Sequence, residues 1–151
     1  MGFSLRTRRP VTLEVGERLP NTLLLSGSAL LLSFMIAVPI GVISAIKRYT
    51  VIDYTFSILA LVGISVPIFW TALLLLQDFA IQLNWFPSSG MVSVRESYTG
   101  FRATLDVLHH MVLPTIVLSL AQVASWSRYQ RSALLEVLDQ DYIRTAHGKG
   151  L

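Results

Sequence analysis

The sequence contains no cysteine, and only 14% of its 151 residues are charged, whereas 53% are hydrophobic. The absence of cysteine excludes disulfide bonds and metal sites built from thiolates. A soluble domain carries about 25% charged residues, so the shortage of charge argues against a water-soluble fold. The net charge of +3 is small and the basic residues are scattered along the chain. No nucleic-acid partner is therefore predicted.

Long apolar runs fill most of the chain instead. Thr22–Ile46, Tyr54–Gln77 and Met111–Ser127 contain 25, 24 and 17 residues without a charge. A helix of about 20 apolar residues crosses the hydrocarbon core of a bilayer. We therefore expect an all-α, polytopic transmembrane helical bundle. Its single domain, residues 1–151, has three spans at about 22–46, 54–78 and 111–130.

Proline and polar residues predict the connections between these spans. A short helix is expected over Pro10–Leu19, followed by a bend at Pro20 before the first span. Pro39 and Pro67 lie inside spans, where each removes a backbone hydrogen bond and favours a kink. The segment Pro87–Tyr98 is rich in Pro, Ser and Gly and is expected to be a loop.

The charge-free runs contain no Asp, Glu, His or Lys, the residues that usually mark chemistry within a membrane. His109 and His110 are adjacent, beside Asp106, at the edge of a span. Neighbouring helix residues face different directions, so the two histidines are interpreted as an interfacial pair. No glycine-rich phosphate loop is present. We expect no catalytic residue, metal ion or cofactor, and any nucleotide chemistry belongs to another chain.

Small and polar residues within the spans allow two interpretations. They can line a polar pathway, or they can let helices pack closely and bond across their interface. For a single serine, packing is the simpler explanation; for Gln122 the two explanations are closer, because a buried amide needs a partner or water. The candidate pathway residues are Ser65, Pro67, Trp70, Gln122 and Ser125.

The distribution of basic residues gives the expected orientation. With three spans, each side of the membrane receives six Lys or Arg residues, so the positive-inside count is tied. Lys47, Arg48, Arg128 and Arg131 directly abut their spans. This proximity favours a cytoplasmic carboxyl-terminal tail.

The tail carries the most specific motif. Residues 141–146 read Asp-Tyr-Ile-Arg-Thr-Ala, and residues 149–151 read Lys-Gly-Leu. This pattern resembles the cytoplasmic loop of inner-membrane subunits of ABC importers of the dipeptide, oligopeptide and nickel class, with its Ala-x-x-x-Gly core at Ala146 and Gly150. Three further segments match the family: Glu17–Thr22, the run Pro39–Ala45 followed by Lys47 and Asp53-Tyr54, and Leu113-Pro114-Thr115.

The resemblance implies a MetI-like permease core and a cytoplasmic coupling helix within residues 139–151. That helix would dock in a groove of a separate ATPase. Ala146 would permit close approach, and Gly150 a sharp turn. Tyr142 and Ile143 would be apolar anchors, and Arg144 and Lys149 a charged rim. The implied coupling residues are Asp141, Tyr142, Ile143, Arg144, Thr145, Ala146, Lys149, Gly150 and Leu151. An amphipathic helix resting on lipid headgroups is the alternative for this segment.

The resemblance also implies the function and the partners. The chain would be a permease subunit of an ATP-driven importer of di- or oligopeptides or related small solutes, in the plasma (inner) membrane of a prokaryote. Its partners would be two ATP-binding cassette subunits, a second homologous permease subunit, an extracytoplasmic substrate-binding protein and the lipid bilayer. The cargo itself cannot be read from the residues.

Two departures from the family pattern leave alternatives open. His147-Gly148 stands where the family commonly has Arg-Ala, and Gly148 lowers helix propensity by about 1 kcal/mol relative to alanine. The family also has further spans before and after the matched region, so the chain is expected to be a central, incomplete portion of a permease. A small membrane adaptor that does not transport, or a truncated and inactive permease remnant, is the alternative function.

Overall fold

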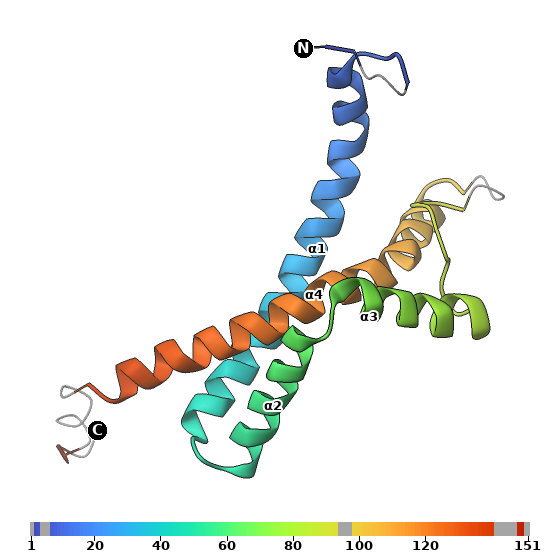
Figure 1. Cartoon of the computed structure of the whole chain (residues 1–151). Helices are drawn as coiled ribbons and strands as arrows, with labels where there is room; N and C mark the ends of the chain where they lie inside the picture. Colours follow the sequence, from blue (N-terminus) through green and yellow to red (C-terminus); the bar gives the residue numbers. More distant parts are fainter. Residues whose placement is uncertain (1, 4–6, 94–97, 141–147, 150–151) are drawn as a thin grey trace.

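The computed structural model describes residues 2–3, 7–93, 98–140 and 148–149 (Figure 1). Its regular elements are α1 (Val11–Ile46), α2 (Val51–Ser65), α3 (Ile68–Leu75), the π-helix η1 (Leu76–Gln82) and α4 (Phe101–Leu138). Among the described residues, β pairing is limited to one isolated bridge between Phe3 and Pro10. The predicted all-α fold is confirmed.

Two helices, α1 and α4, are each long and apolar enough to cross a membrane. The pair formed by α2 with α3 and η1 also qualifies if it is counted as one bent span. The described residues therefore provide two or three membrane-span candidates, where three were expected. Both long helices exceed a bilayer core: their 36 and 38 residues correspond to about 54 and 57 Å at 1.5 Å per residue.

The helix bounds differ from the expected ones at the start of the chain. The predicted short helix over Pro10–Leu19 and the first predicted span form one continuous helix, α1, which passes through both Pro20 and Pro39. Pro10 immediately precedes it. A proline removes one backbone hydrogen bond but leaves the bonds of neighbouring turns, and here they keep the helix in one piece.

The second predicted span is broken rather than kinked. Val66 and Pro67 both have extended backbone angles, and the axes on either side of this break differ by 94°. Proline disfavours helical angles at the residue before it, so α2 ends at Ser65 and α3 begins anew at Ile68. The helical segment then continues as η1 to Gln82, beyond the expected end near Asp78.

The long helices α1 and α4 cross each other and form the core (Figure 1). The Ser28 and Thr115 hydroxyls are 3.1 Å apart, and the Ser33 hydroxyl donates to the Ser119 carbonyl at 3.4 Å. The Phe34 and Trp126 rings meet edge to face at 6.3 Å. In these contacts, residues later in α1 pair with residues later in α4, so the two helices run in the same general direction.

Small residues spaced four apart make this crossing close. The buried face of α1 contains Ala29, Ser33, Ala37, Gly41 and Ala45. Residues four apart share one helix face, and small side chains on that face allow backbones to approach closely. At Gly41 the helices are especially close, because a Cβ there would lie 2.7 Å from Gln130 Cβ and 2.9 Å from the Ser127 carbonyl oxygen.

The connection after η1 is bound to the first turns of α4. The Ser93 backbone N–H and hydroxyl donate to the two carboxylate oxygens of Asp106 at 2.7 and 2.6 Å. His109 Nε2 lies 2.9 Å from the Trp85 carbonyl oxygen, while the neighbouring His110 is buried, with its Nδ1 2.8 Å from the Asp106 carbonyl oxygen. These contacts lie at the end of the molecule where α4 begins, and they hold the connection after η1 against that helix.

The close approach of α1 and α4 at Gly41 can be tested with two substitutions on α1. Gly41→Ala should destabilise the fold by about 1–3 kcal/mol, the usual range for overpacking. Gly27→Ala is the matched control, since a Cβ at Gly27 meets nothing within 4 Å. Both changes gain the same helix propensity, so their difference isolates the contact. Thermal unfolding in detergent measures it, and equal midpoints for the two variants would contradict the close crossing.

Candidate functional site

The most buried charged side chain lies at the opposite end of the molecule, where α1 turns into α2. α1 ends at Ile46, and α2 begins at Val51 after a four-residue turn, residues 47–50. Asp53 stands in the first turn of α2, where the helix dipole favours a negative charge. The residue is only 2% exposed.

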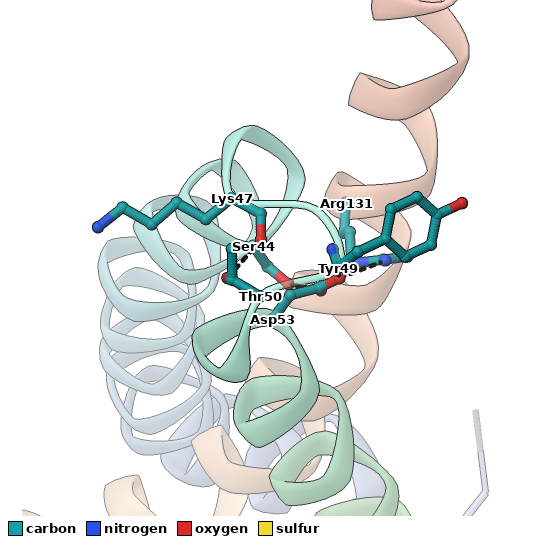
Figure 2. A network of polar contacts seen from close by, with 6 residues as sticks. All are labelled: Ser44, Lys47, Tyr49, Thr50, Asp53 and Arg131. Atoms are coloured by element: carbon teal, nitrogen blue, oxygen red, sulfur yellow. Dashed lines mark hydrogen bonds and ion pairs between the residues drawn. The ribbon is translucent and has the colours of Figure 1, made fainter.

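Three parts of the chain donate hydrogen bonds to the Asp53 carboxylate (Figure 2). From α4, Arg131 Nε reaches Oδ1 at 2.6 Å and its Nη2 reaches Oδ2 at 2.8 Å. From α1, the Ser44 hydroxyl donates to Oδ1. From the turn, the Tyr49 backbone N–H donates to Oδ2 at 3.1 Å. Asp53 therefore joins α1, the turn and α4 to α2.

The Arg131–Asp53 pair has the geometry that suits burial. A planar guanidinium bonded through two nitrogens to two carboxylate oxygens is a strong and directional arrangement. Both carboxylate oxygens also receive a further donor, so the desolvated charge is well satisfied. This arrangement has no free nucleophile or base directed at a substrate. Its role is mechanical, because it holds the end of α1, the start of α2 and the last turns of α4 in fixed positions relative to one another.

The turn itself has an unusual backbone. Tyr49 has a φ of +62°, the left-handed region that residues other than glycine seldom adopt. This conformation directs its N–H to Asp53, and the Thr50 hydroxyl braces the turn by donating to the Lys47 carbonyl at 2.6 Å. The Lys47 side chain points away from Asp53 (Figure 2).

A second ion pair ties the same turn to the end of α4. Arg48 Nη1 lies 3.2 Å from Asp139 Oδ2, and Asp139 is the residue that caps the carboxyl end of α4. The Arg48 guanidinium also lies over the Tyr49 ring, with its Cζ 4.6 Å from the ring centroid. We call Ser44, Arg48, Tyr49, Asp53, Arg131 and Asp139 the turn network.

The predicted coupling loop falls mostly outside the described residues. Asp141, Tyr142, Ile143, Arg144, Thr145, Ala146, Gly150 and Leu151 belong to that undescribed part, so their predicted roles stay predictions. Lys149 is described and is exposed. The segment of residues 139–151 starts at Asp139, which is itself a member of the turn network.

The five predicted pathway residues are spread over three elements. Ser65 and Pro67 flank the break between α2 and α3, Trp70 lies exposed on α3, and Gln122 and Ser125 lie on α4. The Ser65 and Ser125 hydroxyls donate to carbonyls of their own helices, those of Leu61 and Ala121. The Trp70 backbone N–H donates to the Pro67 carbonyl at 3.0 Å, and no side-chain hydrogen bond in the described part of the chain joins the five to one another.

A cavity of about 400 Å³ lies beside the break. Its lining comes from α1, α2, α3, α4 and the α2–α3 break and consists of Ile40, Phe56, Leu59, Ala60, Gly63, Val66, Thr71, Leu120, Val123, Ala124 and Ser127. None of the five predicted pathway residues lines this cavity. Because its lining is largely apolar, this cavity suits an apolar side chain or a helix better than a charged solute.

The turn network was absent from the sequence predictions, although a signal for it exists. Asp53 directly precedes the charge-free run that begins at Tyr54, and Arg131 follows shortly after the run that ends at Ser127. The order of the runs puts both on the same side of the membrane. An acid and a base at the ends of two apolar helices have a strong reason to pair. The sequence does not show which base on that side, Lys47, Arg128 or Arg131, is the partner.

Comparisons with known proteins agree on one family. Residues 37–151 match the family described as binding-protein-dependent transport system inner membrane component. The oligopeptide transport system permease protein AppB of Bacillus subtilis is 41% identical over 146 residues, which cover 97% of this chain and 45% of that protein. The di/tripeptide transport system permease protein DppB of Pseudomonas aeruginosa is 39% identical over 165 residues, covering 100% and 49%. The chain spans about half the length of these relatives.

The Asp53 side chain is more deeply buried than the Arg131 side chain. We therefore predict that removing one or the other destabilises the fold to different extents. Arg131→Met leaves the Asp53 carboxylate unpaired and should destabilise the fold by about 3–5 kcal/mol, as breaking a buried pair does. Asp53→Asn should be less harmful, because the Arg131 side chain is 26% exposed and can turn its guanidinium outward. Denaturant unfolding of the purified protein in detergent measures both.

The double variant Asp53→Asn/Arg131→Met completes a double-mutant cycle with the two single variants. It removes both charges, so it should be more stable than Arg131→Met alone. If Arg131→Met unfolds at the same denaturant concentration as the unmodified protein, the pair does not hold the helix ends together.

Proposed function

The chain belongs to the family of binding-protein-dependent transport system inner membrane components, and we propose that it is part of the permease subunit of an ATP-driven importer for di- and oligopeptides. The peptide cargo is proposed because the relatives AppB and DppB are named oligopeptide and di/tripeptide permeases. The proposed partners are two ATP-binding cassette subunits, a second homologous permease subunit and an extracytoplasmic substrate-binding protein.

The observation that carries this proposal is the family match over helices long enough to cross a membrane. Such a subunit needs a membrane-embedded bundle and a segment that receives force from an ATPase in the cytoplasm. The crossing of α1 and α4 supplies the bundle. ATP hydrolysis would take place in the partner subunits.

Residues 139–151 are the proposed coupling segment. They follow α4 without an intervening loop, because α4 ends at Leu138 and Asp139 caps it. The side chains of Tyr142 and Ile143 would be apolar anchors for a groove of the ATPase, with Arg144 and Lys149 at the rim. Ala146 and Gly150 would allow close approach and a turn.

The contacts between helix ends support the proposed orientation. Arg48 and Arg131 approach Asp139 and Asp53, so the turn after α1 and the end of α4 lie at one end of the molecule. Lys47 and Arg128 belong to the same two helix ends. A basic cluster directly beside two spans favours the cytoplasmic side, which puts the coupling segment where an ATPase can reach it.

The break between α2 and α3 is the proposed boundary of the translocation pathway. Non-helical backbone within a membrane is tolerated only where protein buries it or where it borders a water-filled space. Ser65 and Pro67 stand at this break, and Trp70 follows on α3. Gln122 and Ser125 would contribute to the same pathway from α4.

The proposed orientation is testable with single cysteines, because the chain has none of its own. In intact cells expressing the full-length protein, a membrane-impermeant maleimide should label Ser89→Cys, which is in the exposed connection after η1. It should label Lys149→Cys only after the membrane is permeabilised. The reverse pattern would contradict a cytoplasmic coupling segment.

The proposed function is tested in the complete transporter, reconstituted with its ATPase subunits, second permease and binding protein. Gly150→Trp should abolish peptide uptake while ATP hydrolysis continues, because the bulky ring prevents the turn and the close approach of the segment. Uptake of labelled peptide and phosphate release measure the two activities.

Gly148→Ala is the matched control for this experiment. A Cβ at Gly148 meets nothing within 4 Å, and alanine raises helix propensity, so uptake should be preserved. Unchanged uptake in Gly150→Trp would contradict the proposed role of the coupling segment. A reconstituted wild-type complex that takes up no peptide would contradict the proposed function itself.

A further inference from the structure

The two ion pairs of the turn network differ in burial, although both bind the turn region to α4. Asp53 and Arg131 form the inner pair, with side chains 2% and 26% exposed. Arg48 and Asp139 form the outer pair, with side chains 36% and 66% exposed. Their α4 members are eight residues apart, about 12 Å along a helix. The last two turns of α4 are therefore held at two points.

Tyr49 connects the inner and the outer pair. Its backbone N–H donates to Asp53 Oδ2, while its ring lies beneath the Arg48 guanidinium. Both contacts depend on the left-handed backbone of Tyr49, whose φ is +62°. A residue held in such a conformation requires support from its surroundings, and strain of this kind is frequent at functional positions.

The outer pair is expected to contribute little to the free energy of unfolding. Exposed ion pairs contribute little to folding, because water screens the charges and both side chains lose freedom. Asp139 nevertheless occupies a special position, since it caps the carboxyl end of α4 and is the first residue of the proposed coupling segment. Backbone hydrogen bonds tie Asp139 and Gln140 to the last turn of α4, and the Arg48 side chain ties Asp139 to the α1–α2 turn as well.

We propose that Arg48 and Asp139 are positioning residues that transmit displacement of the coupling segment to α1 and α2, an inference that rests on the proposed function. Arg48 ties Asp139 to the α1–α2 turn, and the inner pair ties that turn to the body of α4. A push on the segment then tilts the three helix ends together. The outer contact persists throughout the transport cycle.

The test measures peptide uptake per ATP hydrolysed in the complete reconstituted transporter. Arg48→Ala and Asp139→Ala should each lower this ratio by up to about fivefold, the largest factor that an exposed ion pair usually supports. The ATPase rate per assembled complex should not fall. Asp139→Ala leaves the Arg48–Tyr49 contact intact, so the two variants together assign the effect to the ion pair. The exchanged pair Arg48→Asp/Asp139→Arg should recover most of the ratio.

Arg9→Ala is the matched control, because it breaks another exposed ion pair. Arg9 and Glu17 are 2.7 Å apart, with side chains 53% and 57% exposed, beside the first turns of α1. Its uptake per ATP should equal that of the wild type. A short thiol crosslinker joining Arg48→Cys to Asp139→Cys should preserve transport, since the contact is proposed to persist.

Each other outcome contradicts the inference. If wild type transports peptide and both alanine variants keep its uptake-to-ATP ratio, the outer pair transmits nothing, and the proposed function stands. Uptake and hydrolysis that fall in parallel, in proportion to assembled complex, would indicate a structural role alone. Loss of transport on crosslinking would mean that the contact must open. A wild-type complex that takes up no peptide overturns the proposed function and this inference together.

Discussion

The buried ion pair between Asp53 and Arg131 is the constraint on which the arrangement of the helix ends depends. A charge removed from water is tolerated only when partners replace its hydration. Asp53 obtains those partners from α1, the turn and α4, so none of the three can shift alone without exposing or orphaning the carboxylate. Small residues hold α1 against α4 by close packing, whereas the hydrogen bonds of Asp53 fix the orientation and register of the helix ends.

Close packing and the ion pair act at different points of the same helix pair. Ala29, Ser33, Ala37 and Gly41 let the backbones of α1 and α4 approach closely by packing alone. The bidentate bonds of Arg131 fix one register, because both carboxylate oxygens must be met at once. The helix pair is therefore fixed in register at the end where Arg131 meets Asp53.

The sequence was sufficient to predict the helical fold and the family, and insufficient to predict the contacts between helices. Runs free of charge predict helices in a membrane from length alone, but they do not show that α1 would continue through Pro20 or that Val66 and Pro67 would break the second span by 94°. Helix continuity at a proline is decided by the surrounding turns and packing. The pairing of Asp53 with Arg131 joins residues 78 apart, and local pattern does not select among several bases at one membrane face.

The break at Pro67 and the turn network have complementary mechanical consequences. α2 is fixed at its start by Asp53 and is discontinuous at its end, so a tilt imposed at the turn moves α2 as a short rigid rod. The 94° break keeps that tilt from being carried as one rod into α3. Any change in the angle between α2 and α3 would be taken up at Ser65–Pro67, beside the cavity lined by α1, α2, α3 and α4. The turn network thus fixes the start of α2, and the break at Pro67 separates its far end from α3.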